Sequence, residues 1–203
     1  MKKLLFMVAV LSLVAFQAEP TLSKKERKTA TSFLKDSEKN VLKTLGNLTD
    51  EQLKFKPATD KWSVQDCMMH IAASEKMLWG MADQSIKAAA NPEKRTEIKW
   101  TDEQVMKNLE DRSTKVKTFA PLEPLNTGFQ NIDEAIASFR ENRGKLIDYV
   151  KSTPSDLRSH VATLPVGSFD AYQMILFIGA HTNRHALQMR EVMADPGFPK
   201  KQG

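Results

Sequence analysis

The segment that decides the fold is residues 168–194, SFDAYQMILFIGAHTNRHALQMREVMA, whose apolar residues recur with the spacing of one long amphipathic helix. Two histidines, His181 and His185, lie four residues apart within this segment. The spacing places both imidazoles on one face of the helix, one turn apart along its axis, where one metal ion could reach both rings. The same side of the helix is largely apolar and is expected to face a core; it carries Met174, Ile178, Gln188 and Val192.

A zinc-type catalytic site usually takes three protein ligands and leaves a fourth position for water, so the histidine pair needs a third ligand. The sequence contains two other histidines. His160 falls in a polar connection, SHVATLP, whereas His70 falls inside the helical pattern SVQDCMMHIAASEKMLWGMA. We therefore predict that His70 is the third ligand. The alternative is a coincidental helix-face pair and a core histidine, because HxxxH lacks the glutamate of the more specific HExxH pattern.

The N-terminus has the pattern of a secretory signal peptide. It reads MKKLLFMVAVLSLVAFQA, with two lysines before a mainly apolar run over residues 4–16 that is short for a membrane span. This predicts a cleaved signal over residues 1–18 and a single exported domain over residues 19–203, located in the periplasm or secreted. No stable membrane span is expected after cleavage. An uncleaved membrane anchor is the alternative interpretation.

Composition is that of one ordinary globular domain: 203 residues, of which 41% are hydrophobic and 27% charged. The formal net charge is +5, but basic residues are interleaved with acidic ones along the whole chain. This mixture indicates a solvated surface rather than a phosphate-binding track, so no nucleic-acid partner is expected. Cys67 is the only cysteine, which excludes an intramolecular disulfide. We interpret it as a small buried residue, in preference to a nucleophile or a fourth ligand.

Apolar periodicity and capping residues predict four long helices and one shorter helix. Ser63 is expected to cap one long helix through a capping box with Asp66, and Ser168 is expected to cap the last helix. No segment shows enough alternation for a strand, so no sheet is expected. Single, scattered glycines exclude a P-loop and a dinucleotide-binding loop. The first long helix is expected to end at Gly46 or Asn47, and the other three long helices are expected over residues 64–86, 132–152 and 168–194. The shorter helix, over residues 102–120, is expected to be peripheral.

Two charged residues interrupt the apolar faces of the predicted helices. Glu75 lies in the apolar stripe of the helix that carries His70, and Arg143 lies in the apolar face of helix 132–152. Carboxylates are rarely buried unpaired, so the favoured interpretation of Glu75 is an ion pair with an arginine such as Arg143 or Arg184. The other interpretation makes Glu75 the candidate catalytic residue, which handles a proton or orients a ligand.

Two motifs together resemble a known family. WSVQDCMMHIAASE, over residues 62–75, and HTNRHALQMREV, over residues 181–192, are similar to the motifs of the DinB-like (DinB/YfiT-like) superfamily of metalloenzymes. The resemblance implies an all-α, up-down-down-up four-helix bundle with an additional short helix. It also implies that His70, His181 and His185 hold one divalent metal ion, zinc or nickel.

The resemblance implies less about the reaction, since characterised relatives include thiol-dependent S-transferases and many members are known only as stress-associated proteins. We expect an exported metal-dependent enzyme, of the hydrolase or thiol S-transferase type, that acts on a small molecule which could be a thiol. Gln188 and Arg184 are candidates to hold the metal ligands in place by contacts outside the coordination sphere. Arg184 lies off the ligand face, so the alternative for it is a solvated side chain or a pair with Glu191. The alternative is a non-catalytic exported protein that binds a metal or a small ligand. A homodimer is compatible with either hypothesis.

Overall fold

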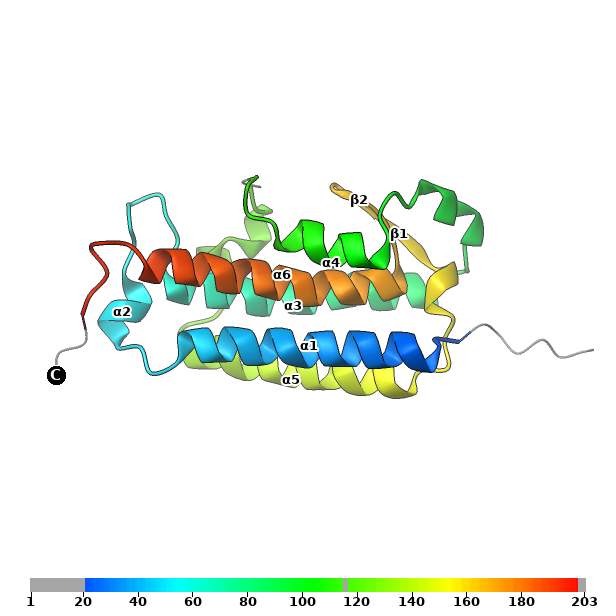
Figure 1. Ribbon diagram of the computed structural model, residues 1–203, viewed down its shortest axis with the longest axis horizontal. Coiled ribbons are helices and arrows are strands. Elements are labelled where there is room, and N and C mark those ends of the chain that lie inside the picture. Colours follow the sequence, from blue (N-terminus) through cyan, green and yellow to red (C-terminus); the bar gives the residue numbers. More distant parts are fainter. Residues whose placement is uncertain (1–20, 115–116, 201–203) are drawn as a thin grey trace, which may run out of the picture.

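The computed structural model describes residues 21–114 and 117–200, so the predicted signal peptide lies outside the described residues. Four long helices dominate this part of the chain (Figure 1). They are α1 (Lys24–Leu45), α3 (Val64–Lys87), α5 (Ile132–Ser152) and α6 (Ala171–Met193). The shorter elements are α2 (Asp50–Lys54), η1 (Pro92–Glu97), α4 (Asp102–Glu110), η2 (Ala120–Leu122), η3 (Pro124–Asn126), η4 (Leu157–Ser159), β1 (Val161–Leu164) and β2 (Gly167–Asp170).

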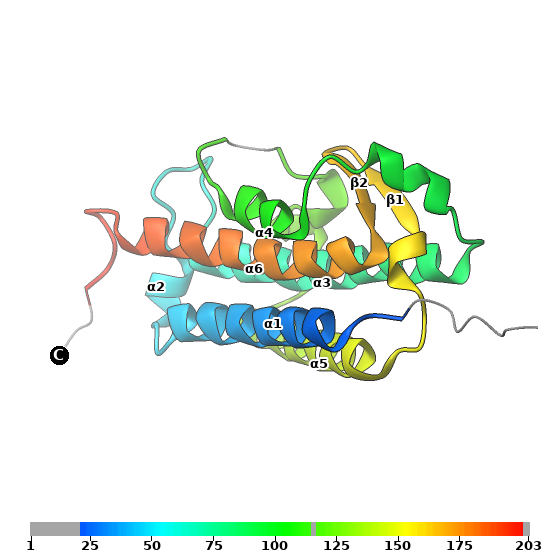
Figure 2. The ribbon, with the colours of Figure 1, turned by 45° about the vertical axis from the view of Figure 1, so that its right-hand side comes forward.

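The long helices form an up-down-down-up four-helix bundle, as predicted. In Figure 1, α1 and α6 run from right to left, whereas α3 and α5 run from left to right. Helix α1 packs against α5 and α6, and α3 packs against the same two helices. Because α3 and α5 are parallel, the chain between them must return along the length of the bundle. Helix α4 lies in this return connection and packs on the outside of α6 (Figure 2).

Side-chain caps fix where the helices begin. The hydroxyl of Ser63 accepts a hydrogen bond from the Asp66 amide, and the Asp66 carboxylate accepts one from the Ser63 amide, which confirms the predicted capping box. Helix α1 ends at Leu45, and its C-cap is Gly46, one of the two predicted stops, where a φ of 48° favours glycine. The prediction for the last helix was wrong: its N-cap is Asp170, and Ser168 lies in β2.

The expectation that the chain forms no sheet was also wrong. Strands β1 and β2 pair antiparallel, from Val161 opposite Asp170 to Leu164 opposite Gly167. Each strand has only four residues, and buried and exposed residues do not alternate along either strand, so the sequence shows no period-two pattern there. The hairpin packs beside η1 and the start of α6. Among the described residues, no helix is both long and apolar enough to cross a membrane.

A buried polar group separates the apolar core into two clusters. One cluster contains Leu34, Leu78 and Leu146 and fills one half of the bundle, and the other contains Val41 and Phe139 and fills the other half. The side chains that lie between the two clusters along the helices are polar and buried: Ser37 of α1, Glu75 of α3, Arg143 of α5 and Thr182 of α6. Every long helix therefore contributes to one polar layer in the middle of the bundle.

Arg143 is the centre of this polar layer. Its Nε and one terminal nitrogen each donate to a carboxylate oxygen of Glu75, both at 2.7 Å. The remaining hydrogens go to the Leu34 carbonyl at 2.6 Å, Ser37 Oγ at 2.7 Å and Thr182 Oγ1 at 2.9 Å. All five donors of the guanidinium are thus paired. The observed pair matches the ion-pair interpretation of Glu75, with Arg143 rather than Arg184 as the partner.

Candidate metal centre

Three histidines converge in the half of the bundle where α3 begins and α6 ends. His70 comes from α3, two turns after the Ser63 cap, and His181 and His185 come from α6. The Nε2 atoms of His70 and His185 each lie 3.2 Å from the Nε2 atom of His181. These three residues form a group whose ligand atoms all lie within 4.8 Å of one another. The three residues predicted as ligands are therefore brought together by the fold.

The spacing of these nitrogen atoms suits a shared cation. Zinc–nitrogen bonds of about 2.0–2.1 Å in a tetrahedral arrangement place two ligand nitrogens about 3.3 Å apart. The two separations to His181 Nε2, both 3.2 Å, agree with that value, and all three ligand atoms lie within 4.8 Å of one another. Three histidines also leave a fourth position for water or a substrate atom, which is the pattern of catalytic rather than structural zinc sites.

Hydrogen bonds to carbonyl oxygens determine the tautomers of two of these rings. His70 Nδ1 lies 2.8 Å from the Leu122 carbonyl oxygen, and His185 Nδ1 lies 2.9 Å from Gln188 Oε1. A carbonyl oxygen can only accept, so both Nδ1 atoms must donate. In the neutral rings the lone pairs then lie on Nε2 of His70 and His185, and both point at His181. This is the tautomer that a metal ion bound through Nε2 requires.

The surroundings keep the three rings uncharged. Burial is the largest cause and lowers the pKa of all three histidines. For His181 and His185 the neighbouring imidazoles add to the effect and bring each pKa well below its ordinary value. For His70 the hydrogen bond to Leu122 opposes the shift. A lowered pKa in a base favours the neutral form near pH 7, which is the form that binds metal ions.

Aromatic rings enclose the histidine group. The Trp62 ring lies 4.8 Å from that of His70 and stacks on His185 at 5.9 Å, measured between ring centroids. Phe177 stacks on His181 at 6.3 Å. Trp62 was not among the predicted site residues, although its position directly before the helix that carries His70 was an available signal. Trp62 and Phe177 therefore pack against the rings of the histidine group.

The other candidate residues lie outside the histidine group. Cys67 is fully buried, and burial raises the pKa of its thiol, which makes it unreactive. His160 Nδ1 donates to the Ser85 carbonyl at 2.9 Å. Both carboxylate oxygens of Glu75 accept hydrogen bonds from Arg143 rather than from a histidine of the group. A role of Glu75 in proton transfer therefore stays a prediction. Arg184 donates to the backbone carbonyls of Asp111 and Thr114. These hydrogen bonds connect α6 with the segment that follows α4.

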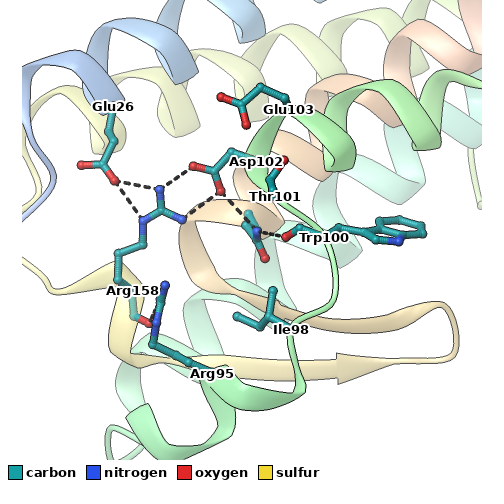
Figure 3. Close-up of a pocket in the computed structure, with 9 residues that line it drawn as sticks. Glu26, Arg95, Ile98, Trp100, Thr101, Asp102, Glu103 and Arg158 are labelled. Atoms are coloured by element: carbon teal, nitrogen blue, oxygen red, sulfur yellow. Dashed lines mark hydrogen bonds and ion pairs between the residues drawn. The ribbon is translucent and has the colours of Figure 1, made fainter.

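A second polar cluster lies at the opposite end of the bundle and borders a surface hollow of about 550 Å³ (Figure 3). Arg158 of η4 donates there to Glu26 of α1 at 2.7 Å, to Asp102 of α4 at 2.6 Å and to the buried Asp170 at 3.0 Å. Its guanidinium also lies 4.1 Å above the Tyr172 ring. Because Arg158 is paired on all sides, this cluster connects α1, α4 and α6 and is a structural junction.

Replacing Arg158 with alanine is expected to lower the free energy of unfolding by about 2 kcal/mol, because it removes several charge-assisted hydrogen bonds that solvent screens only in part. Urea denaturation measures the change. Arg95→Ala is the matched control, since Arg95 pairs with the same Asp170 but is 44% exposed and should matter less. Equal stability of the Arg158 variant and the wild type would show that the cluster contributes nothing.

Comparison with known proteins agrees with this fold. A sequence model of the DinB superfamily matches residues 34–189. The uncharacterized protein YuaE of Bacillus subtilis (strain 168) is 26% identical over 161 residues, which cover 73% of this chain and 87% of YuaE.

Among solved structures, YfiT from Bacillus subtilis, described as a probable metal-dependent hydrolase with an unusual four-helix bundle topology, superposes with a TM-score of 0.60. The match has 14% identity and covers 88% of this chain and 92% of YfiT, so it demonstrates a shared fold. The superfamily match, by contrast, concerns the sequence itself and extends over more than half of the chain. The chain therefore belongs to the DinB superfamily.

Proposed function

We propose that this protein is a metal-dependent hydrolase that holds one divalent ion, zinc or nickel, through His70, His181 and His185. The observation that carries the proposal is the convergence of three imidazoles: the Nε2 atoms of His70 and His185 each lie 3.2 Å from that of His181, and all three ligand atoms lie within 4.8 Å of one another. The description of YfiT as a probable metal-dependent hydrolase supports the choice of reaction. A divalent ion bound by three neutral imidazoles keeps its full charge, so it can polarise a substrate carbonyl or phosphoryl group and acidify water.

The protein's own residues have separate tasks in this proposal. The carbonyl oxygens of Leu122 and Gln188 hold two of the rings in the ligand tautomer. Trp62 stacks on the His185 ring and Phe177 stacks on the His181 ring, so each aromatic side chain shields one face of an imidazole from water. The substrate is a small molecule, and the N-terminal pattern supports export to the periplasm or the medium as the place of action. Thiol transfer uses the same ligand set and is an outcome that the assay must distinguish from hydrolysis.

The proposal is tested on untagged protein purified without chelators. We expect about one equivalent of a divalent metal per chain by elemental analysis, loss of ester or amide hydrolysis after chelation, and recovery after addition of zinc, nickel or manganese. A parallel assay with low-molecular-weight thiols separates hydrolysis from S-transfer. Metal binding without turnover would favour the non-catalytic binding protein. Full activity of the metal-free protein would exclude a metal-dependent reaction.

A further inference from the structure

The hydrogen-bond partner of His185 is itself held by the chain that follows α4. Gln188 Oε1 accepts from His185 Nδ1 at 2.9 Å and from a terminal nitrogen of Arg112 at 3.2 Å. The other side of the Arg112 guanidinium donates to both carboxylate oxygens of Glu191, at 2.7 and 2.8 Å. Four side chains thus form one continuous series from Glu191 through Arg112 and Gln188 to His185, which we name the α4–α6 relay.

The chemistry of Arg112 fixes the direction of every hydrogen bond in the α4–α6 relay. A guanidinium has donors and no acceptor, so the Gln188 atom that faces it must be the carbonyl oxygen and not the amide nitrogen. That oxygen then faces His185 Nδ1 as well, and the ring can only donate to it. A glutamine alone could rotate and offer its amide nitrogen, which would turn the lone pair of His185 away from the metal centre. Arg112 prevents this rotation of the Gln188 amide, because it can only donate to the carbonyl oxygen.

Charge and burial in the α4–α6 relay also suit a neighbouring cation. An arginine near a divalent ion repels it, and the bidentate pair with Glu191 offsets part of that repulsion. The Arg112 side chain is 19% exposed, so its position is held more firmly than that of a solvated surface arginine. The relay can therefore orient Gln188 without adding net positive charge beside the ligands.

The connection between α4 and α5 also supplies the hydrogen-bond partner of His70. Residue 112 lies just after α4, and Leu122, whose carbonyl accepts from His70 Nδ1, lies in η2 of the same connection. This connection therefore orients His70 directly through Leu122, and contacts His185 indirectly, through Arg112 and Gln188 of α6. An ion bound at the three histidines would in turn stabilise this segment, because such coupling acts in both directions.

We propose that Gln188 and Arg112 are positioning residues of the metal centre, and that they hold His185 in its Nδ1–H tautomer and thereby raise metal affinity. This inference rests on the proposed function, since it concerns the same three ligands. Gln188 acts directly on His185, and Arg112 acts through Gln188. The two residues should therefore behave as one unit, so that the effect of removing Arg112 disappears once Gln188 is gone.

The test measures the zinc dissociation constant of the full chain by competition with a chromophoric chelator. We expect Gln188→Ala to weaken zinc binding about 10- to 100-fold. Arg112→Ala should weaken it less, and should add nothing in the Gln188→Ala background. Gln188→Glu keeps an acceptor for both neighbours and should bind zinc nearly as well as the wild type. Arg190→Ala is the matched control, because Arg190 lies on α6 but bonds to Asn40 and Thr44 of α1.

A second readout works without any metal. Long-range proton–nitrogen NMR of the metal-free protein reports the tautomer of His185, which should be Nδ1–H in the wild type and mixed in Gln188→Ala. Unchanged zinc affinity and an unchanged tautomer in Gln188→Ala would overturn the proposal for both residues. Equal weakening by Arg112→Ala with and without Gln188 would overturn it for Arg112. If the wild type binds no metal, the proposed function fails, while the tautomer still decides whether the relay orients His185.

Discussion

Replacing His70, His181 or His185 with alanine is expected to abolish stoichiometric metal binding, whereas His160→Ala leaves it intact. Each of the three rings supplies one Nε2 atom to a group with no further protein ligand among the described residues. Two ligands and water hold an ion far more weakly than three. The measurement is the metal-to-protein ratio after desalting. His160 is a matched control because its Nδ1 already donates to the Ser85 carbonyl, away from the group.

Thermal unfolding gives an independent readout of the same prediction. A ligand that binds only the folded state at 100 times its dissociation constant adds about 2.7 kcal/mol to the free energy of unfolding. Zinc should therefore raise the melting temperature of the wild type and of His160→Ala, and leave that of the other three variants unchanged. Equal loss of metal in all four variants, or in none, would contradict the assignment of the ligands.

The parts of the metal centre that the sequence predicts depend on local signals. The spacing of His181 and His185 fixes their common face, and the capping box at Ser63 and Asp66 fixes the start of the helix that carries His70. The meeting of the two helices is not local, because it depends on the order in which the helices pack. The sequence favoured His70 over His160 because only His70 falls in a helical pattern, and the resemblance to the DinB-like superfamily added that the two helices meet.

The parts that the sequence does not predict depend on contacts between distant segments. The Leu122 carbonyl reaches His70 across 52 positions, and Arg112 reaches Gln188 across 76. Leu122 lies in an irregular connection, where no periodicity indicates which groups face the core. Arg112 was expected inside a helix over 102–120, but α4 ends at Glu110, so its direction could not be predicted from a helical pattern. The hairpin β1–β2 escaped prediction because buried and exposed residues do not alternate along either of its strands.

The ion-pair partner of Glu75 could be predicted only in part from the pattern of charged residues. A carboxylate in an apolar stripe predicts a buried partner, and both Arg143 and Arg184 satisfied the pattern. The structure selects Arg143, whose side chain is fully buried between all four long helices. Arg184 points instead toward the chain after α4. The choice depends on which way each helix is rotated in the bundle, and neighbouring helices set that rotation.

Arg143→Ala is expected to destabilise the protein by about 3–5 kcal/mol, which is the usual effect of leaving a buried charge without its partner. Burial raises the pKa of Glu75, and the charge and hydrogen bonds of Arg143 oppose that shift, so loss of the guanidinium leaves a carboxylate that is unfavourable when ionised. The measurement is the free energy of unfolding from urea denaturation. Lys145→Ala, on the exposed side of the same helix, should leave stability nearly unchanged.

A double variant separates the loss of a partner from the loss of packing. Ser37 and Thr182 already donate to the carbonyls of Leu34 and Ile178, so removal of Arg143 leaves Glu75 as the main unpaired group. Arg143→Met combined with Glu75→Leu removes both charges and keeps most of the buried volume. This variant should therefore be more stable than Arg143→Met alone.

Glu75→Gln then decides between the two interpretations of this carboxylate. If Glu75 only pairs with Arg143, the variant is less stable but, at a temperature where it is folded, it keeps the metal content and the pH profile of turnover of the wild type. If Glu75 handles a proton, the pH profile changes although metal is still bound. If Arg143→Ala were as stable as the wild type, the Arg143–Glu75 pair would not stabilise the four-helix bundle. That result would contradict the structural role of Glu75.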